Sequence, residues 1–421
     1  MQITDTQGNG SGVGTFGPGQ ATLTGSLGVE RTAARDAFRF ALVVWLVSRM
    51  SLTILGATIM SVAPDWTRDH VRRDYPDVTL PSHDLYGYTI GVWNIYDVPV
   101  YTDIAEHGYT GDLWWQTAYF PGYPLLIKLF SFPMLGEYLL SALLVANLFA
   151  LLFFWCLYRL VDMDYGAEVA RRAVIWAAIF PTSFFLFMGY TESIMLAAMV
   201  GAVYYARLGK WWLAGLLSGL AALTKQPGIF ILLPLAYILW QEVRANRHDR
   251  PYRRALQGAW LLLCPLAALS YTLYRYLFIS VPIQDVTDVG GTQRLAFPGY
   301  PLLQAVSVIK PDNPMLPYNL MDIFFAMLTI ALIAGVVIKV RSWPYVLFAV
   351  TVGLANLSVY VDGYINRPEV NSPRRLLLIF PIFILLAVVT HNRKLFKPLA
   401  YISAALYIVL AGLFTNWVFV S

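Results

Sequence analysis

The sequence predicts an all-α protein that crosses a membrane many times, and three observations lead to this prediction. Of the 421 residues, 58% are hydrophobic and only 13% are charged, whereas a soluble domain carries about 25% charged residues. Apolar runs of membrane-spanning length, about 20 residues, recur along the chain. These runs are continuously apolar rather than alternating, which argues against a transmembrane β-barrel. The net charge of +5 is typical of basic cytoplasmic loops and does not indicate a nucleic-acid partner.

The first part of the chain has a different composition. Residues 1–29 are rich in Gly, Thr and Ser, so we expect a disordered tail there and a single transmembrane domain over 30–421. No signal peptide is expected, because the first long apolar run begins near Ala41 and lacks a cleavage site. Cys156 and Cys264 both fall inside predicted spans and cannot build a disulfide framework.

Hydropathy predicts about eleven spans. They cover 38–62, 137–160, 172–188, 192–207, 211–224, 228–241, 256–279, 319–339, 343–360, 376–390 and 398–418. Pro181 and Pro227 interrupt two of the middle spans, which we therefore expect to be broken. The run 119–133 is apolar but too short to cross, so we expect it to lie in the membrane interface.

Basic clusters in alternate loops orient the chain. They all lie on one side if the N-terminus is cytoplasmic, as the positive-inside rule requires. The segment 63–118, with nine carboxylates against three arginines, then faces outward. With 119–133 it forms a large first extracytoplasmic loop, 63–133, in which we expect amphipathic helices. Any active site is therefore expected on the extracytoplasmic face of the plasma membrane in a prokaryote, or of the endoplasmic reticulum in a eukaryote.

One acid in this loop has an unusual position. On a helix, spacings of four, four and three put four residues on one face: Trp93, Asp97, Tyr101 and Ile104. Glu106 would face the opposite way, so we expect Asp97 in apolar surroundings and Glu106 in water. Apolar surroundings raise the pKa of a carboxyl group, which suits proton abstraction from an alcohol. The structural alternative is a helix cap, since Pro99 follows two residues later.

Three cations are expected on the outer side, where positive charge is scarce: Lys225, Arg374 and Arg375. A phosphate partner would explain them, and so would snorkelling or pairing with an acid such as Glu192. Glu192 begins a predicted span, where an acid stabilises the helix N-terminus. With Tyr190 it is also a candidate to bind a sugar. The sequence has no P-loop, GxGxxG, CxxC or HExxH motif, so neither nucleotide hydrolysis nor a metal site is indicated.

Four blocks, in order over about residues 38–390, resemble the PIG-V type mannosyltransferases (glycosyltransferase family 76). They are Trp93-x-x-x-Asp97-x-x-x-Tyr101-x-Asp103-Ile104-Ala105-x-x-Gly108-Tyr109, Phe120-Pro121-Gly122-Tyr123-Pro124-Leu125-Leu126, Phe180-Pro181-Thr182-Ser183 with Tyr190-Thr191-Glu192-Ser193, and Ser372-Pro373-Arg374-Arg375-Leu376 before Phe380-Pro381. The chain departs from the family at Arg375, where an aromatic residue is usual, and at Lys225, where relatives often have Arg. Near 285–300 only Gln293 and Arg294 resemble the family's loop.

The resemblance implies the GT-C membrane fold and an inverting transfer of mannose, or a related hexose, from a polyprenyl- or dolichyl-phosphate sugar. The acceptor would be a lipid or a glycan, and membrane lipids would be further partners. The resemblance implies no resident cofactor and leaves a divalent cation open. Asp97 would be the general base. The donor phosphate would bind to Lys225, Arg374 and Arg375. The substrate would be bound or oriented by Tyr101, Tyr190, Glu192 and Arg294. The alternatives are a polytopic transporter or lipid flippase, since broken helices are common in transporters, and a catalytically inactive relative.

Overall fold

The computed structural model describes residues 23–62, 81–110, 114–245, 251–279, 288–290, 293–361, 367–368, 372–418 and 420. The first helix, α1 (Leu23–Val62), begins inside the range for which a disordered tail is predicted. Residues 1–22 of that tail lie outside the described residues, as do 63–80 of the first loop. The division into a tail and one transmembrane domain therefore stays a prediction.

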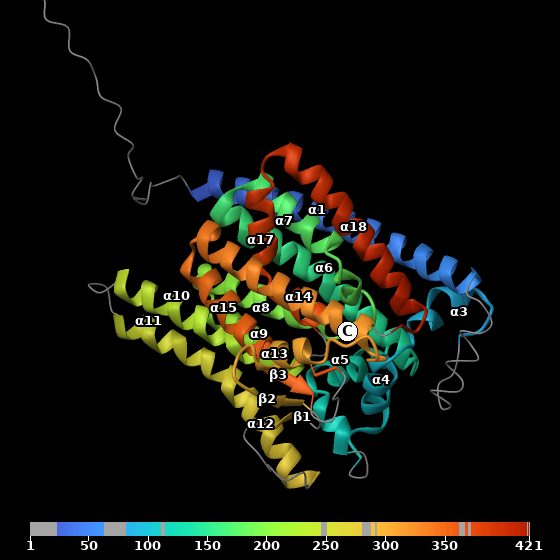
Figure 1. The fold of residues 1–421 in the computed structure, drawn as a ribbon. Coiled ribbons are helices and arrows are strands. Elements are labelled where there is room, and N and C mark those ends of the chain that lie inside the picture. The colour runs from blue at the N-terminus through green and yellow to red at the C-terminus, as the bar shows by residue number, and fades with distance from the viewer. Residues whose placement is uncertain are drawn as a thin grey trace, which may run out of the picture.

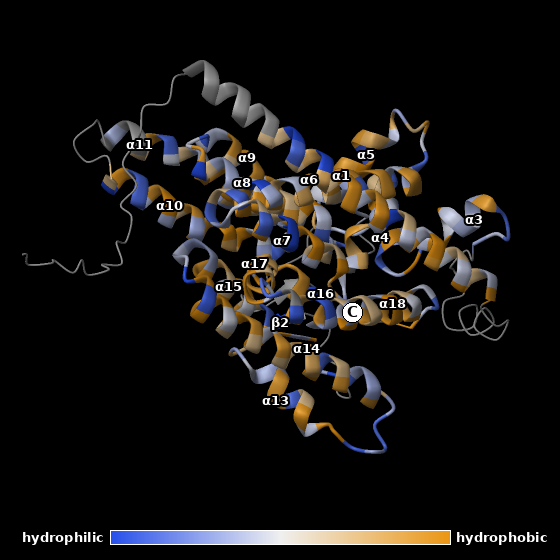
Figure 2. Ribbon diagram, turned by 90° about the horizontal axis from the view of Figure 1, so that it is seen from above, coloured by the Kyte–Doolittle hydropathy of each residue, from blue (hydrophilic) through white to orange (hydrophobic). Residues whose placement is uncertain are grey.

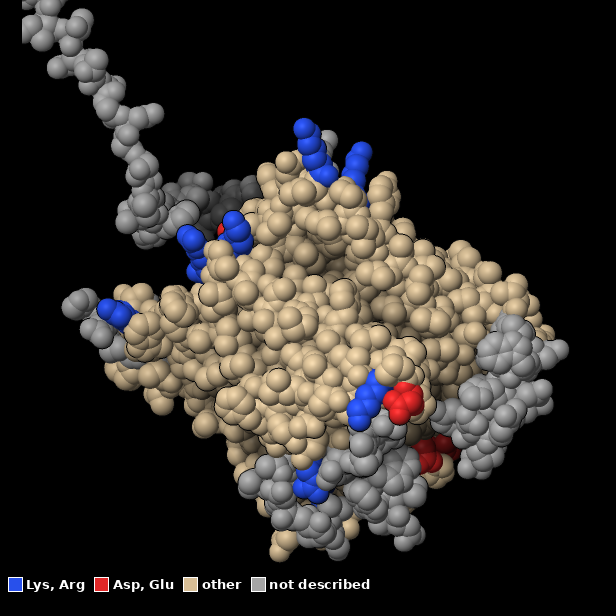
Figure 3. Space-filling model, in the orientation of Figure 1, with Lys and Arg blue, Asp and Glu red and all other residues tan. Residues whose placement is uncertain are grey.

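Helices make up most of the described chain, and this confirms the predicted fold class. Six of them are long and apolar enough to cross a membrane: Ala33–Val62, Tyr138–Tyr165, Gln226–Ala245, Ala255–Phe278, Leu316–Val340 and Lys394–Thr415. Two shorter apolar helices cover Trp211–Thr224 and Trp343–Asn356. The predicted number of eleven spans is not confirmed. On the face drawn in Figure 3, a broad surface without charged side chains lies between charged groups at the edges, as lipid contact requires.

The centre of the bundle is built around α6 (Tyr138–Tyr165) and α8 (Glu192–Arg207), which pack against each other. Nearly every residue of α8 is buried, as expected for a helix that is hydrophobic all round. α7 (Ala167–Ile179) packs against α6 and against α17 (Pro381–Val389). At one edge α1 lies beside α18 (Arg393–Thr415), on which hydrophobic residues predominate (Figures 1 and 2).

The two predicted helix breaks are confirmed. α7 ends at Ile179, before Pro181, and a short 3-10 helix, η3 (Ser183–Leu186), follows it. The second break separates α9 (Trp211–Thr224) from η4 (Gln226–Ile231), which holds Pro227 in its first turn. Proline lacks an amide hydrogen and clashes with the preceding turn, so each helix ends before it.

The first loop contains short helices, as predicted for 63–133, within its described residues. They are α3 (Leu85–Thr89), η1 (Gly91–Trp93), α4 (Asp97–His107), η2 (Trp114–Ala118) and α5 (Gly122–Ser131). α4 packs against α5 at one side of the bundle (Figure 1). α5 is too short to cross a bilayer, and the interfacial position predicted for 119–133 stays a prediction.

The remaining helices complete the wall of the bundle. They are α10 (Leu232–Ala245), α11 (Pro251–Gln257), η5 (Gly258–Leu262), α12 (Leu263–Phe278), α13 (Tyr300–Ser307), α14 (Leu316–Gly335), the π-helix η6 (Val336–Val340), α15 (Trp343–Asn356) and α16 (Ser372–Leu377). A small antiparallel sheet has the order β1 (Asp288–Gly290), β2 (Gln293–Leu295), β3 (Val359–Val361). β3 follows α15 and pairs with β2 through Arg294 and Tyr360. The sequence did not predict this sheet.

Candidate active site

The start of α4 fixes the position of Asp97. Tyr96 is the N-cap residue and has a φ of 53°, a left-handed backbone that is unfavourable for a bulky residue. Its ring packs against Phe414 and Trp417, with centroids 4.8 Å and 5.3 Å away. Asp97 is therefore the first helical residue and not the cap. Trp93 belongs to η1, so the predicted apolar face does not run through it on one helix.

A buried arginine joins two acids that are far apart in the sequence. Arg374 Nη1 donates to Asp97 Oδ2 at 2.6 Å, and its Nε donates to Glu192 Oε1 at 2.5 Å. A longer bond of 3.3 Å runs from Nη2 to Glu192 Oε2. Lys225 Nζ lies 3.2 Å from Glu192 Oε1. We call Asp97, Arg374, Glu192 and Lys225 the charged cluster, in which negative and positive groups alternate.

The two ends of the charged cluster are more accessible than its middle. The side chains of Glu192 and Arg374 are 0% and 6% exposed, whereas those of Asp97 and Lys225 are 21% and 30% exposed. A substrate can therefore reach Asp97 from one end and Lys225 from the other. Burying charged groups in this way is unfavourable unless they are paired, and the alternation of signs provides that pairing.

Polar groups surround Asp97, which corrects the prediction of an apolar niche. The Tyr119 hydroxyl donates to Asp97 Oδ1 at 3.1 Å, while Oδ2 is bonded to Arg374. The Asp97 backbone N–H donates to the Tyr190 hydroxyl at 3.3 Å. Burial, followed by the neighbouring Asp97 charge, raises the pKa of Tyr119 well above its usual value. Tyr119 therefore stays protonated and holds one carboxylate oxygen.

Aromatic rings line the cation side. The Arg374 guanidinium lies 4.4 Å from the centroid of the Tyr190 ring and 5.4 Å from that of Phe185, distances at which a cation is attracted to a ring face. Tyr101 packs edge-on against Tyr119, with centroids 5.1 Å apart. Of the two tyrosines predicted to contact substrate, Tyr190 lies at the charged cluster, and Tyr101 supports Tyr119 behind it.

Arg375 lies outside the charged cluster and contacts backbone carbonyls. Its Nη1 donates to the backbone carbonyls of Val359 at 3.0 Å and Asn356 at 3.4 Å. Asn356 Nδ2 donates in return to the Arg375 carbonyl at 3.0 Å. These bonds tie α16 to the end of α15, and the predicted phosphate contact of Arg375 stays a prediction. Arg294 lies on β2, and its predicted contact with substrate stays a prediction.

Two features of the site were missed in the sequence. Tyr119, just before a recognised block, is one. The other is Asp322, fully buried in α14, whose Oδ2 accepts from Arg367 Nε at 2.6 Å. Its Oδ1 accepts from the backbone N–H of Ser372 at 3.3 Å. Because Ser372 begins α16, Asp322 fixes the helix that carries Arg374. An acid inside an apolar span was the available signal.

Comparisons with known sequences find similarity to mannosyltransferases. A family model described as dolichyl-phosphate-mannose-protein mannosyltransferase matches residues 120–271. The GPI alpha-1,6-mannosyltransferase 2 of Mus musculus is 27% identical over 237 residues, which is 52% of this chain and 44% of the relative. That of Rattus norvegicus is 25% identical over 274 residues, which is 59% of this chain and 52% of the relative. The chain thus spans about half the length of these curated relatives.

Two solved structures are matched at low sequence identity. ArnT from Cupriavidus metallidurans bound to undecaprenyl phosphate is 15% identical with a TM-score of 0.48, over 95% of this chain and 70% of that one. The Archaeoglobus fulgidus oligosaccharyltransferase in the apo form is also 15% identical, with a TM-score of 0.39, over 88% of this chain and 55% of that one. The family match over residues 120–271 and the curated relatives thus show that this chain is similar to mannosyltransferases over part of its length.

Proposed function

We propose that the protein is an integral membrane glycosyltransferase that moves mannose, or a related hexose, from a polyprenyl- or dolichyl-phosphate sugar to a lipid or glycan acceptor. The transfer takes place on the extracytoplasmic side with inversion at the sugar carbon. The observation that carries the proposal is the charged cluster, in which an accessible carboxylate, Asp97, is bonded to a buried guanidinium, Arg374. The names of the matched family and relatives support mannose as the sugar and dolichyl phosphate as its carrier.

The chemistry follows from the order of charges in the cluster. Asp97 accepts the proton of the acceptor hydroxyl as its oxygen attacks the first carbon of the sugar. The bond from that carbon to the phosphate oxygen breaks, and its electron pair stays on the phosphate. Arg374 and Lys225 stabilise this developing charge. A base and a leaving group on opposite faces of the sugar give inversion in a single displacement.

Glu192 holds the two cations in place for this step. It is fully buried and contacts both Arg374 and Lys225. Without a donor, two acids balance two bases, so the bound phosphate adds negative charge to a neutral cluster. A divalent cation is a further candidate to share this charge. Among the residues that the structure describes, no three His, Cys, Asp or Glu side chains gather to hold one.

The variant Asp97→Asn tests the proposal. Transfer of radiolabelled mannose from polyprenyl-phosphate mannose is measured with the full chain in lipid nanodiscs. We expect the rate to fall by about 10²–10⁴, the range found when a general base is lost. The matched control is Asp103→Asn on the same helix, whose carboxylate is bonded to His107 and Gln116 outside the charged cluster. Unimpaired transfer by Asp97→Asn would remove this carboxylate from the mechanism.

A further inference from the structure

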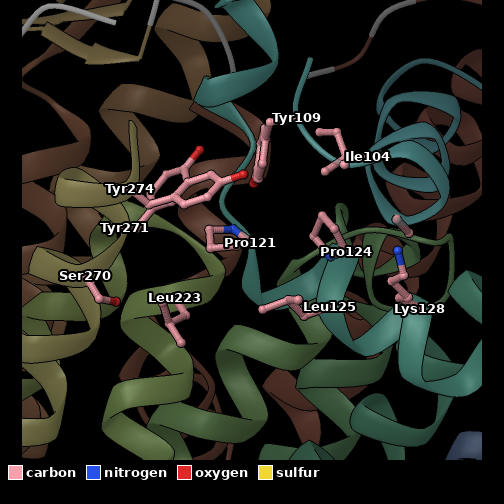
Figure 4. Close-up of a pocket in the computed structure, with 12 residues that line it drawn as sticks. Ile104, Tyr109, Pro121, Pro124, Leu125, Lys128, Leu223, Ser270, Tyr271 and Tyr274 are labelled. Carbon is pink, nitrogen blue, oxygen red and sulfur yellow. The ribbon is translucent and has the colours of Figure 1, made fainter. Parts of the chain in front are cut away.

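A cavity of about 410 Å³ lies between α4, α5, α9 and α12. Its size is in the range of pockets that hold small ligands, roughly 300–1,000 Å³. Figure 4 shows Tyr109, Tyr271 and Tyr274 at one end and Lys128 at the other. Most of the remaining lining is apolar and comes from Ile104, Ala105, Pro121, Pro124, Leu125 and Leu223. The cavity therefore suits a hydrocarbon chain that carries a charged group at one end.

The apolar lining continues onto the outer surface of α5. Leu125, which lines the cavity, is 59% exposed. Leu129 and Phe132 follow at spacings of four and three, so they lie on the same stripe, and they are 66% and 89% exposed. In a membrane protein such a stripe is in contact with lipid. A lipid chain can thus reach the cavity from the bilayer along the apolar residues of α5, on the face that also carries Lys128.

The position of the cavity relative to Asp97 indicates whether it serves the acceptor or the donor. The Tyr119 hydroxyl donates to Asp97 Oδ1. The Tyr119 carbonyl accepts a hydrogen bond of 2.5 Å from the hydroxyl of Tyr109, and Tyr109 lines the cavity. Ile104 follows Asp97 by seven residues, or about 10 Å along α4. Arg374 contacts the other carboxylate oxygen, Oδ2. The cavity therefore lies on the Tyr119 side of the base, and the cation for the phosphate lies on the other.

We propose that this cavity binds the hydrocarbon chain of a lipid acceptor, with an anionic group of that lipid beside Lys128. The proposal rests on the proposed function, because inversion brings the acceptor to the face of the sugar opposite the departing phosphate. It goes further by choosing a lipid acceptor over a soluble glycan or a protein. It also assigns Lys128, which belongs to none of the predicted site residues, to the acceptor.

The test is photolabelling, which needs no turnover. The probe is dodecyl phosphate with a diazirine at the end of its chain, added to the full chain in nanodiscs and mapped by mass spectrometry. We expect label on peptides from α4, α5 and α12. Leu125→Trp fills the mouth of the cavity and should lower labelling by about tenfold. The matched control Leu129→Trp, one turn along the same stripe, should change it by less than about twofold.

Two further measurements test whether Lys128 binds the anionic group of the lipid and whether the donor competes for the cavity. Lys128→Ala should lower labelling by dodecyl phosphate about tenfold and leave labelling by the uncharged dodecanol analogue unchanged. Excess farnesyl phosphate, which mimics the isoprenoid donor, should not displace the label. Four results would each overturn the proposal. They are label outside the cavity, labelling that Leu125→Trp leaves unchanged, equal loss of labelling by both probes in Lys128→Ala, and displacement of the label by farnesyl phosphate. Asp97→Asn should keep its labelling, so failure of the transfer assay and failure of this test are distinguishable.

Discussion

Replacement of Arg374 by lysine keeps the charge of the cluster but removes the guanidinium that bonds to two acids at once. The guanidinium makes bonds of 2.5 and 3.3 Å to Glu192 and one of 2.6 Å to Asp97. A lysine ammonium is a compact charge that does not bridge two acids in this fork-like way. A hydrogen bond to a charged group contributes about 1.5–3 kcal/mol, and the cation–ring contact at 4.4 Å from Tyr190 adds about 0.5–2 kcal/mol. Loss of the hydrogen bond to one acid and of the contact with the Tyr190 ring thus removes about 3 kcal/mol of stabilising free energy.

This loss corresponds to a fall of about 100-fold in kcat/KM for Arg374→Lys, since about 1.4 kcal/mol is a factor of ten. The assay is mannose transfer from polyprenyl-phosphate mannose at limiting donor, with size-exclusion chromatography to confirm that each variant is folded. The control is Arg375→Lys, at the neighbouring position, where the side chain donates to the carbonyls of Asn356 and Val359. It should retain activity within about threefold. If Arg374→Lys matches the wild type, bridging of the two acids is not required for transfer.

Three further predictions follow from single contacts. Tyr119→Phe removes the hydroxyl that donates to Asp97 at 3.1 Å, and kcat should fall about tenfold; an unchanged kcat would show that this bond does not orient the base. In Gly122→Ala the new Cβ would lie 2.8 Å from the backbone of Leu223. This should lower the free energy of unfolding by about 1–3 kcal/mol, measured by thermal unfolding, and an unaltered transition would contradict the close approach of α5 and α9. Burial and the nearby guanidinium of the cluster lower the pKa of Lys225 to about 8. Below that pH the ammonium is charged and binds phosphate, and above it the donor KM should rise; in Lys225→Gln this rise should be absent.

The sequence identified the members of the charged cluster and offered Glu192 as a partner for the cations, but it did not predict the contact between Arg374 and Asp97. Spacing and family blocks singled out Asp97, Glu192, Lys225 and Arg374, and the structure brings all four together. Asp97 and Arg374 are 277 positions apart, and no local pattern states which distant cation an acid meets. Hydropathy locates spans and proline locates their ends, because both depend on neighbouring residues. Pairing across the bundle depends on tertiary packing.

What the sequence did not predict correctly around Asp97 also depends on tertiary packing. Asp97 was expected in an apolar niche because helical spacing describes one helix and not the groups that other helices bring to it. Arg374 and Arg375 point in different directions, since neighbouring residues of a helix project about 100° apart, and the sequence did not predict which of them contacts Asp97. The turn at Tyr96, with φ of 53°, separates Trp93 from α4. A tyrosine gives no signal for that backbone conformation, which its packing on α18 stabilises.

Under the proposed function, the equal numbers of acids and bases in the charged cluster bear on how the protein distinguishes a lipid-phosphate sugar from the bulk lipids around it. Phospholipid headgroups are far more abundant than any sugar carrier, and many are anionic. An unpaired pocket of cations would attract all of them. Here Asp97 and Glu192 already neutralise Arg374 and Lys225, so a phosphate alone must compete with carboxylates for its contacts. Discrimination then falls to groups that recognise the hexose, and ordinary phospholipids should be poor competitive inhibitors.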